Sequence, residues 1–129
     1  MRPSLLFILL VLFVGYQVFM TFTKEHKFLE FARKYNDKSW MPAVLLRTGN
    51  FWFGIQEYKR AKPIFEECMK DDFKLAQERP DCFYGLARTQ DKMKRFDSAK
   101  QNYEIFIGSF PAHAKTGKAK ERFRVLNER

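Results

Sequence analysis

Few residues of this 129-residue chain are of the types that catalyse reactions or bind metal ions. His26 and His113 are its two histidines, and neither has a carboxylate or cysteine at the spacing of a metal site or catalytic triad. The segment Thr116-Gly117-Lys118 is the nearest approach to a phosphate-binding loop, but the upstream glycine of that motif is missing. Because no acid, base and nucleophile converge, the sequence predicts a binding protein with no enzymatic activity, cofactor or metal.

Two cysteines, Cys68 and Cys82, form neither a CxxC motif nor a pattern of zinc ligands. A disulfide would join them if the domain were exported. We favour a different interpretation, in which both are small residues buried between packed helices. The spacing alone leaves both interpretations open.

The amino-terminal segment is the most apolar part of the chain. Residues 3–23 contain no charged side chain, whereas Lys24 and Glu25 follow at once. A helix needs about 20 apolar residues to cross a bilayer core, so this segment is long enough. A cleavable signal peptide is the alternative, but bulky residues stand where a cleavage site needs small ones. The sequence thus predicts a transmembrane anchor over residues 1–23 that contacts membrane lipid.

Basic residues flank the predicted anchor unequally. Arg2 precedes it, and five basic residues follow it closely: Lys24, Lys27, Arg33, Lys34 and Lys38. The positive-inside rule then favours a single-pass protein whose domain is cytoplasmic. Long domains can cross membranes regardless of charge, so the periplasmic or exported side stays open. The formal net charge of +9 favours anionic lipid head groups or acidic partners.

After the anchor, residues 24–39 are expected to form a juxtamembrane helix and a turn. Apolar residues recur at helical spacing from Phe28 to Tyr35, and Asn36-Asp37-Lys38-Ser39 is a turn signal. From Trp40 onward the apolar pattern is helical, and no stretch alternates like a strand. The sequence therefore predicts a helical domain over residues 40–129.

Two segments within this domain resemble each other. The segment 58–68 carries an aromatic residue, an alanine three positions later and a second aromatic four positions after that. The segment 96–106 repeats this order, so that Ala61 and Ala99 occupy equivalent places. Pro111 follows the second segment. Such self-similarity is typical of a protein built from helical repeats.

The pattern resembles the tetratricopeptide repeat family, whose consensus of about 34 residues places small and aromatic residues in two helices before a closing proline. Aligning the two alanines puts the repeats at about 42–75 and 80–113. The resemblance implies an all-α fold, in which a single amino-terminal transmembrane helix precedes a small α-solenoid of two helix-turn-helix repeats. Because the two alanines lie farther apart than the consensus length, repeat one should have either a longer second helix or a larger loop. Gln90 stands where the family usually has an aromatic residue.

The resemblance also implies a groove for a protein partner, because the first helix of each repeat lines the concave face of such solenoids. The family's clamp for chaperone tails is not supported, since Leu46 and Gly85 occupy two of its positions. An ordinary solvated face is the alternative. The predicted partner-binding residues are Leu46, Asn50, Phe53, Tyr84, Arg88 and Asp91.

The carboxyl-terminal segment 114–129 is predicted to be a capping helix, with Ala119, Phe123 and Leu126 on its apolar face. Its other positions are rich in basic residues, which predicts a surface for anionic lipid or an acidic partner. A nucleic-acid partner is not predicted, because no reading motif is present. The predicted basic surface comprises Lys115, Lys118, Lys120, Arg122 and Arg124.

These features predict a membrane-anchored protein–protein interaction module. It would act as a scaffold or assembly factor for a membrane-associated complex, binding a peptide segment or a subunit of that complex. The alternative is a permanent small structural subunit that packs through its transmembrane helix into a larger membrane complex. Gln17 favours protein contact within the span, because an amide is costly against lipid.

Overall fold

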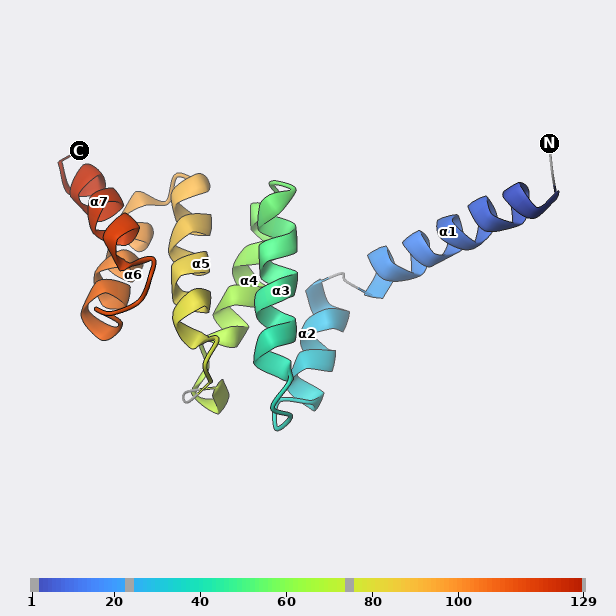
Figure 1. Cartoon of the computed structure of the whole chain (residues 1–129), viewed down its shortest axis with the longest axis horizontal. Helices are drawn as coiled ribbons and strands as arrows, with labels where there is room; N and C mark the ends of the chain where they lie inside the picture. The colour runs from blue at the N-terminus through green and yellow to red at the C-terminus, as the bar shows by residue number, and fades with distance from the viewer. Residues whose placement is uncertain (1–2, 23–24, 74–75, 129) are drawn as a thin grey trace. The chain divides into compact units, whose positions relative to one another are not determined.

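The computed structural model describes residues 3–22, 25–73 and 76–128. Within these ranges the chain forms seven α-helices and one 3-10 helix, and no strand (Figure 1). The predicted all-α fold class is confirmed. The helices belong to two compact units, residues 1–34 and residues 35–129.

The first unit contains α1 (Pro3–Phe22) and α2 (Glu25–Lys34). The large apolar side chains of α1 from Leu5 to Val14 are between 48% and 66% exposed. In α2, apolar residues recur on one face, and the helix ends with Arg33 and Lys34. Basic residues in the last turn interact favourably with the helix dipole.

Among the residues that the structure describes, no helix has the length and apolar character needed to cross a membrane. The predicted transmembrane anchor over residues 1–23, and the single-pass membrane localisation based on it, therefore gain no support from the described helices. Parts of this prediction, at residues 1–2 and 23–24, lie outside the described ranges, as does Arg129 at the other end of the chain.

The second unit consists of two helical hairpins and a final helix. Consecutive α-helices of this unit pack against each other, and α3 also contacts α5. The short turns within each hairpin make the packing local along the chain. The elements are α3 (Met41–Gly54), α4 (Tyr58–Cys68), the 3-10 helix η1 (Asp71–Phe73), α5 (Arg79–Lys92), α6 (Phe96–Ser109) and α7 (Thr116–Asn127).

The two hairpins follow the same plan with a fixed offset. The first helices begin at positions 41 and 79 and the second helices at positions 58 and 96, so the offset is the same for both pairs. It is also the offset between Ala61 and Ala99. Pro42 and Pro80 both stand in the first turn of their helices. Proline is tolerated there, because the first-turn N–H groups have no partner within the helix.

The turns inside the hairpins are also equivalent. Gln56 has a positive φ of 66°. Its N–H donates to the Phe53 carbonyl at 3.0 Å, and the Glu57 N–H donates to the Trp52 carbonyl at 2.8 Å. The second hairpin repeats both hydrogen bonds around Lys94, which has a φ of 61°. Both first helices thus end in a Schellman motif built on a residue other than glycine.

The connection between the hairpins contains the residues by which the repeat offset exceeds the family consensus. Helix α4 ends at Cys68 after 11 residues, whereas α6 has 14 residues. The connection from α4 to α5 spans residues 69–78, and η1 lies within it with Phe73 buried. The enlarged loop is therefore correct and the longer helix wrong. Residues 74–75, at the end of the predicted first repeat, lie outside the described ranges.

A disulfide joins Cys68, the last residue of α4, to Cys82 in the first turn of α5. Both residues are fully buried. Our preferred interpretation of two unpaired buried cysteines was wrong. The packing of α4 against α5 brings the two Cα atoms to 6.0 Å, within the range that a disulfide spans.

Small residues in the core let neighbouring helices pack closely. Phe65 of α4 is fully buried, and its ring lies beside Gly49 of α3 and Gly85 of α5. A second cluster of buried residues joins α5, α6 and α7 and includes positions that the sequence analysis assigned to an apolar capping face. Its members are Ala87, Ala99, Tyr103, Phe106, Ala119 and Leu126.

Candidate functional site

A cavity of about 380 Å³ opens between α3 and α5. The helices place their side chains there because residues at i, i+4 and i+7 share one helical face. Five of the six predicted partner-binding residues line this groove cavity, and only Asp91 does not. The lining residues are Leu46, Asn50, Phe53, Asp81, Tyr84, Gly85, Arg88 and Lys115.

Arg88 is held in place by two aromatic rings. Its guanidinium carbon lies 4.3 Å from the ring centroid of Phe53 and 5.5 Å from that of Tyr84. The side chain is exposed to solvent, and no described residue forms an ion pair with it. Attraction between a cation and aromatic faces restrains Arg88 without neutralising its charge. The guanidinium therefore remains available to an anionic group.

Gly85 forms part of the lining because a larger residue does not fit. A Cβ built at this position would lie 2.5 Å from Cε1 of Phe65. The missing side chain lets α4 and α5 pack closely around that ring. The cavity is consequently lined at this point by helix backbone, beside the side chains of Tyr84 and Arg88.

One carboxylate at the rim of the groove is already satisfied within the fold. His113 Nε2 lies 3.0 Å from Asp81 Oδ1, and the Lys115 N–H donates to His113 Nδ1 at 3.0 Å. Because Nδ1 accepts, the imidazole presents its other nitrogen to Asp81 as a donor. His113 also packs edge-on against Phe106, with ring centroids 5.3 Å apart. The pairing of His113 was not predicted from the sequence, since His113 lies in the connection between α6 and α7 and its partner Asp81 lies in the first turn of α5.

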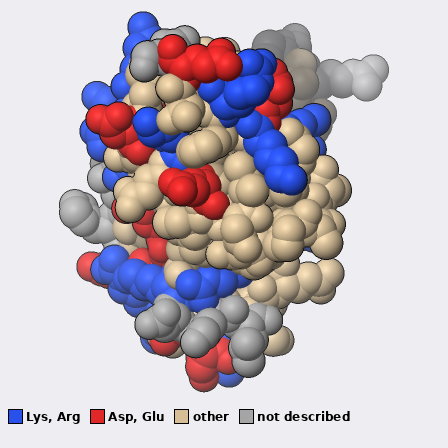
Figure 2. Space-filling model, turned by 90° about the vertical axis from the view of Figure 1, so that its left-hand side faces the viewer, with Lys and Arg blue, Asp and Glu red and all other residues tan. Residues whose placement is uncertain are grey.

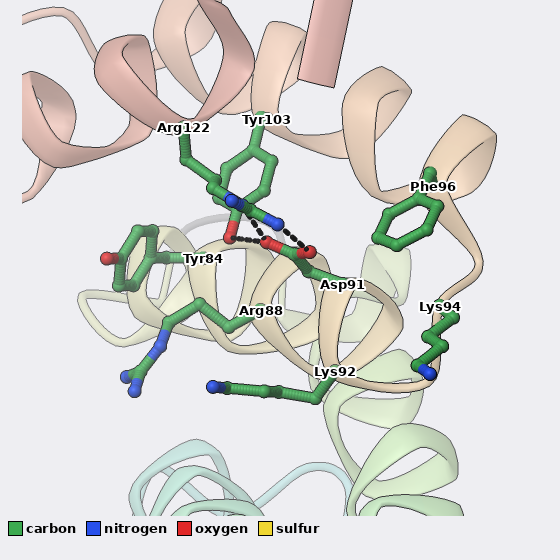
Figure 3. A pocket seen from close by; sticks show the side chains of 8 residues that line it. All are labelled: Tyr84, Arg88, Asp91, Lys92, Lys94, Phe96, Tyr103 and Arg122. Atoms are coloured by element: carbon green, nitrogen blue, oxygen red, sulfur yellow. Dashed lines mark hydrogen bonds and ion pairs between the residues drawn. The ribbon is translucent and has the colours of Figure 1, made fainter. Parts of the chain in front are cut away.

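A second and larger cavity, of about 560 Å³, is lined by residues of α5, of the turn that follows it, and of α6 and α7 (Figure 3). It shares Tyr84 and Arg88 with the groove cavity. We call it the basic cavity, because four of its eight lining residues are Lys or Arg. The eight lining residues are Tyr84, Arg88, Asp91, Lys92, Lys94, Phe96, Tyr103 and Arg122.

The Asp91 carboxylate is hydrogen-bonded to side chains of α6 and α7. It accepts hydrogen bonds from Nε of Arg122 and, at 2.7 Å, from Nη2 of the same side chain, and Tyr103 Oη lies 3.4 Å from its Oδ2. The hydrogen bond to Asp91 raises the pKa of Arg122. Burial, and then the Asp91 charge, raises the pKa of Tyr103. Asp91 and Arg122, which the sequence analysis assigned to a partner site and a basic surface, thus pair with each other.

The other predicted basic residues of the carboxyl-terminal segment also differ in environment. Arg124 donates to Glu121 at 2.6 Å and to Glu128 at 2.8 Å, and these carboxylates raise the pKa of Arg124. Lys118 and Lys120 are exposed, and Lys115 lines the groove cavity. Figure 2 shows basic and acidic side chains interspersed on the face that it presents.

Among the described residues, no group of three or more His, Cys, Asp or Glu side chains could hold a metal ion. The side chains that line the two cavities are mostly cationic, hydrogen-bonding and aromatic. Such an arrangement is suited to binding.

Residues 81–113 match the family model described as the tetratricopeptide repeat. This match supports the predicted resemblance of the chain to the tetratricopeptide repeat family. The matched range covers most of α5 and all of α6, and it falls within the second repeat predicted at about 80–113. The chain has no significant match among curated proteins or solved structures. A tetratricopeptide repeat suggests a protein–protein interaction module.

The matched segment departs from the family pattern at Gln90, where the structure shows a hydrogen bond in place of an aromatic contact. Gln90 is 7% exposed, and its Oε1 accepts a hydrogen bond of 2.6 Å from Nδ2 of Asn102. This bond joins α5 to α6 where an aromatic residue would otherwise fill the space. A buried amide with such a partner avoids the cost of an unsatisfied polar group.

Proposed function

We propose that the second unit is a protein-interaction module whose groove cavity binds an extended segment of a partner protein. The observation that carries this proposal is the convergence of predicted residues from both hairpins on one cavity. Leu46, Phe53 and Tyr84 offer apolar surface for an anchor side chain, and Asn50 and Arg88 offer hydrogen-bond donors beside it. Through this groove the protein would act as a scaffold or assembly factor.

Site-specific photo-crosslinking in cells tests the groove. A photoreactive amino acid replaces Asn50, which is exposed in the groove, or Gln101, which is exposed on α6 and lines neither cavity. We expect one discrete crosslinked partner from position 50 and none from position 101. Equal crosslinking from both positions, or none from either, would mean an ordinary solvated face.

Substitution then tests whether the groove residues bind that partner. Phe53→Ala removes the ring beneath Arg88 and should weaken the interaction by about tenfold or more, as expected for an aromatic anchor. Ile105→Ala is the matched control, because Ile105 is an exposed apolar residue of α6. Comparable losses from both substitutions would contradict the proposal.

We propose further that α1 holds this module at a membrane. Support comes from the absence of charge in residues 3–23 and from the exposed apolar side chains of α1. The full-length chain should remain in the membrane pellet after alkaline carbonate extraction. Leu9→Arg combined with Leu12→Arg should release it, because each central arginine costs about 2.5–3.5 kcal/mol in a membrane. Recovery of the unsubstituted chain in the supernatant would contradict anchoring.

The alternative of a permanent structural subunit makes a different prediction. The exposed apolar surface of α1 would then pack against other subunits. After gentle detergent extraction, the chain would migrate in one large complex even when Phe53→Ala abolishes groove binding. Loss of the complex in that variant would favour the interaction module.

We also propose that the second unit resides in an oxidising compartment. The Cys68–Cys82 disulfide supports this location, since disulfides persist outside the cytoplasm and are rare within it. This proposal replaces the cytoplasmic side favoured by the flanking lysines and arginines. Acid-quenched cells should yield a chain whose thiols react with maleimide only after reduction. Thiols that react without reduction would instead indicate that the domain is cytoplasmic.

A further inference from the structure

The charges of the two cavities do not balance within the fold. Asp91 is engaged by Arg122, and Asp81 is engaged by His113. The groove and basic cavities contain no other acidic residue. Among the described residues, no ion pair reaches the remaining four cations, which are Arg88, Lys92, Lys94 and Lys115. Counted together, the two cavities are lined by five cations and two carboxylates, so their combined charge is positive.

Two of these cations, Arg88 and Lys92, lie on α5. Arg88 and Lys92 are one helical turn apart, and Figure 3 shows their side chains extending side by side, away from the Asp91–Arg122 pair. Lys94 belongs to the turn that follows α5. Aromatic surface lies beside them, from Tyr84 and Phe96. The arrangement offers two adjacent anion sites next to apolar surface.

We propose that the occupant is an acidic segment of a partner protein, in extended conformation, with carboxylates on alternate residues. This inference rests on the proposed function, because it assigns the chemistry of the segment that the groove binds. Side chains at i and i+4 of a helix are about 5–6 Å apart. Alternate residues of an extended chain are about 6.6 Å apart, since each residue advances about 3.3 Å. Two acidic residues separated by one residue thus match Arg88 and Lys92.

The direction of the segment follows from the position of the rings. Arg88 is fixed over Phe53 and Tyr84, so the carboxylate that it binds lies beside the groove cavity. An apolar residue on the α3 side of that carboxylate would then contact Leu46 and Phe53. The second carboxylate would lie in the basic cavity, near Lys92. The sequence pattern that we expect is an apolar residue beside two acidic residues on alternate positions.

Selection from a random peptide display library tests this chemistry without knowledge of the partner. The full-length chain is immobilised in mild detergent, and the enriched peptides are sequenced. Enrichment of acidic residues on alternate positions is the expected result. Enrichment of neutral or basic peptides would overturn this inference and leave the proposed groove intact. Failure to enrich any peptide would count against both the groove and this inference.

Charge substitutions then test which residues bind the enriched acidic peptide. Arg88→Gln and Lys92→Gln should each weaken binding by about tenfold, as expected for the loss of one hydrogen bond to a charged group. Lys59→Gln removes the same charge from an exposed position of α4 outside both cavities and should leave binding unchanged. Thermal unfolding of each variant shows that it is folded. Equal weakening by all three variants would overturn the inference.

Two further binding measurements separate the acidic segment from other polyanions. Vesicles containing phosphatidylserine and single-stranded RNA serve as competitors of the labelled peptide. Weak competition, unaffected by Lys92→Gln, is the expected result. Competition as strong as that of the peptide, and lost in the same variant, would replace the acidic segment with a lipid or nucleic-acid partner.

Discussion

The ring of Phe65 occupies the place where a side chain on Gly85 would lie, since a Cβ at residue 85 would be 2.5 Å from its Cε1 atom. Gly49 approaches the same ring from α3, with a corresponding distance of 2.7 Å. One aromatic residue of the first hairpin thus packs beside glycines of both hairpins. This contact makes the hairpins a single folded unit and brings α3 and α5 close enough to form the groove cavity.

Gly85→Ala should destabilise the protein even though alanine is the better helix former. The added methyl group meets a buried ring, and overpacking of this kind costs about 1–3 kcal/mol. Urea unfolding followed by circular dichroism measures the effect. Gly108→Ala is the matched control, because Gly108 is a helical glycine with no atom within 4 Å of a built Cβ. The control should be neutral or slightly stabilising, and equal losses would contradict the packing argument.

Gln56→Gly should stabilise the first hairpin. Its positive φ of 66° costs a residue with a Cβ about 1 kcal/mol, and glycine avoids most of that cost. A rise in the urea midpoint is therefore expected. Gln101→Gly, in the regular helix α6, should instead lower the midpoint, since glycine costs about 1 kcal/mol in a helix interior. A lower midpoint for the substitution at residue 56 would refute the turn assignment.

Removal of the disulfide should weaken the second unit substantially. Cys68→Ala combined with Cys82→Ala frees a loop closed across a sequence separation of 14 residues, and a loop of about this length is worth about 3 kcal/mol. The unfolding free energy should fall by that amount. Reductant should lower the stability of the unsubstituted chain and leave the double variant unaffected. A chain whose stability is insensitive to reductant would contradict the pairing.

The Asp91–Arg122 pair should contribute measurably to the docking of α7. Asp91 is partly buried, and the two side chains form two hydrogen bonds between α5 and α7. A double-mutant cycle with Asp91→Asn and Arg122→Gln should give a coupling energy of about 1 kcal/mol. The Arg124–Glu121 pair is exposed and should give a smaller coupling in the same experiment. Additive effects of Asp91→Asn and Arg122→Gln on the unfolding free energy would contradict a role of the Asp91–Arg122 pair in the docking of α7.

Local periodicity was enough to predict several parts of the second unit. The spacing of Ala61 and Ala99 predicted two hairpins with a constant offset, and the helix starts keep that offset. The resemblance to the tetratricopeptide repeat family implied that Leu46, Asn50 and Phe53 share the groove face of one helix, and they line one cavity. These features depend on one helix or one hairpin, so the sequence contains them directly.

Pairings between distant residues could not be predicted in this way. The family resemblance implied a partner-binding role for Asp91, and the basic composition of the last segment predicted a surface role for Arg122. Their pairing could not be predicted, because they are far apart in sequence and belong to different helices. Lys92, Lys94 and Tyr103 were likewise missed as residues of the basic cavity. The i+4 spacing from Arg88 to Lys92 is a sequence signal that could have placed Lys92 beside the predicted residue Arg88.

The sequence by itself determined the helical class, the repeat offset and the excess of positive charge, because helix periodicity and composition are local properties of the chain. Only the tertiary structure decided which charges remain free and which cysteines meet. Packing of Phe65 beside two glycines sets the separation of α3 and α5, and the packing of α4 against α5 closes the distance from Cys68 to Cys82. Both outcomes depend on contacts between residues far apart in sequence, which spacing alone does not specify.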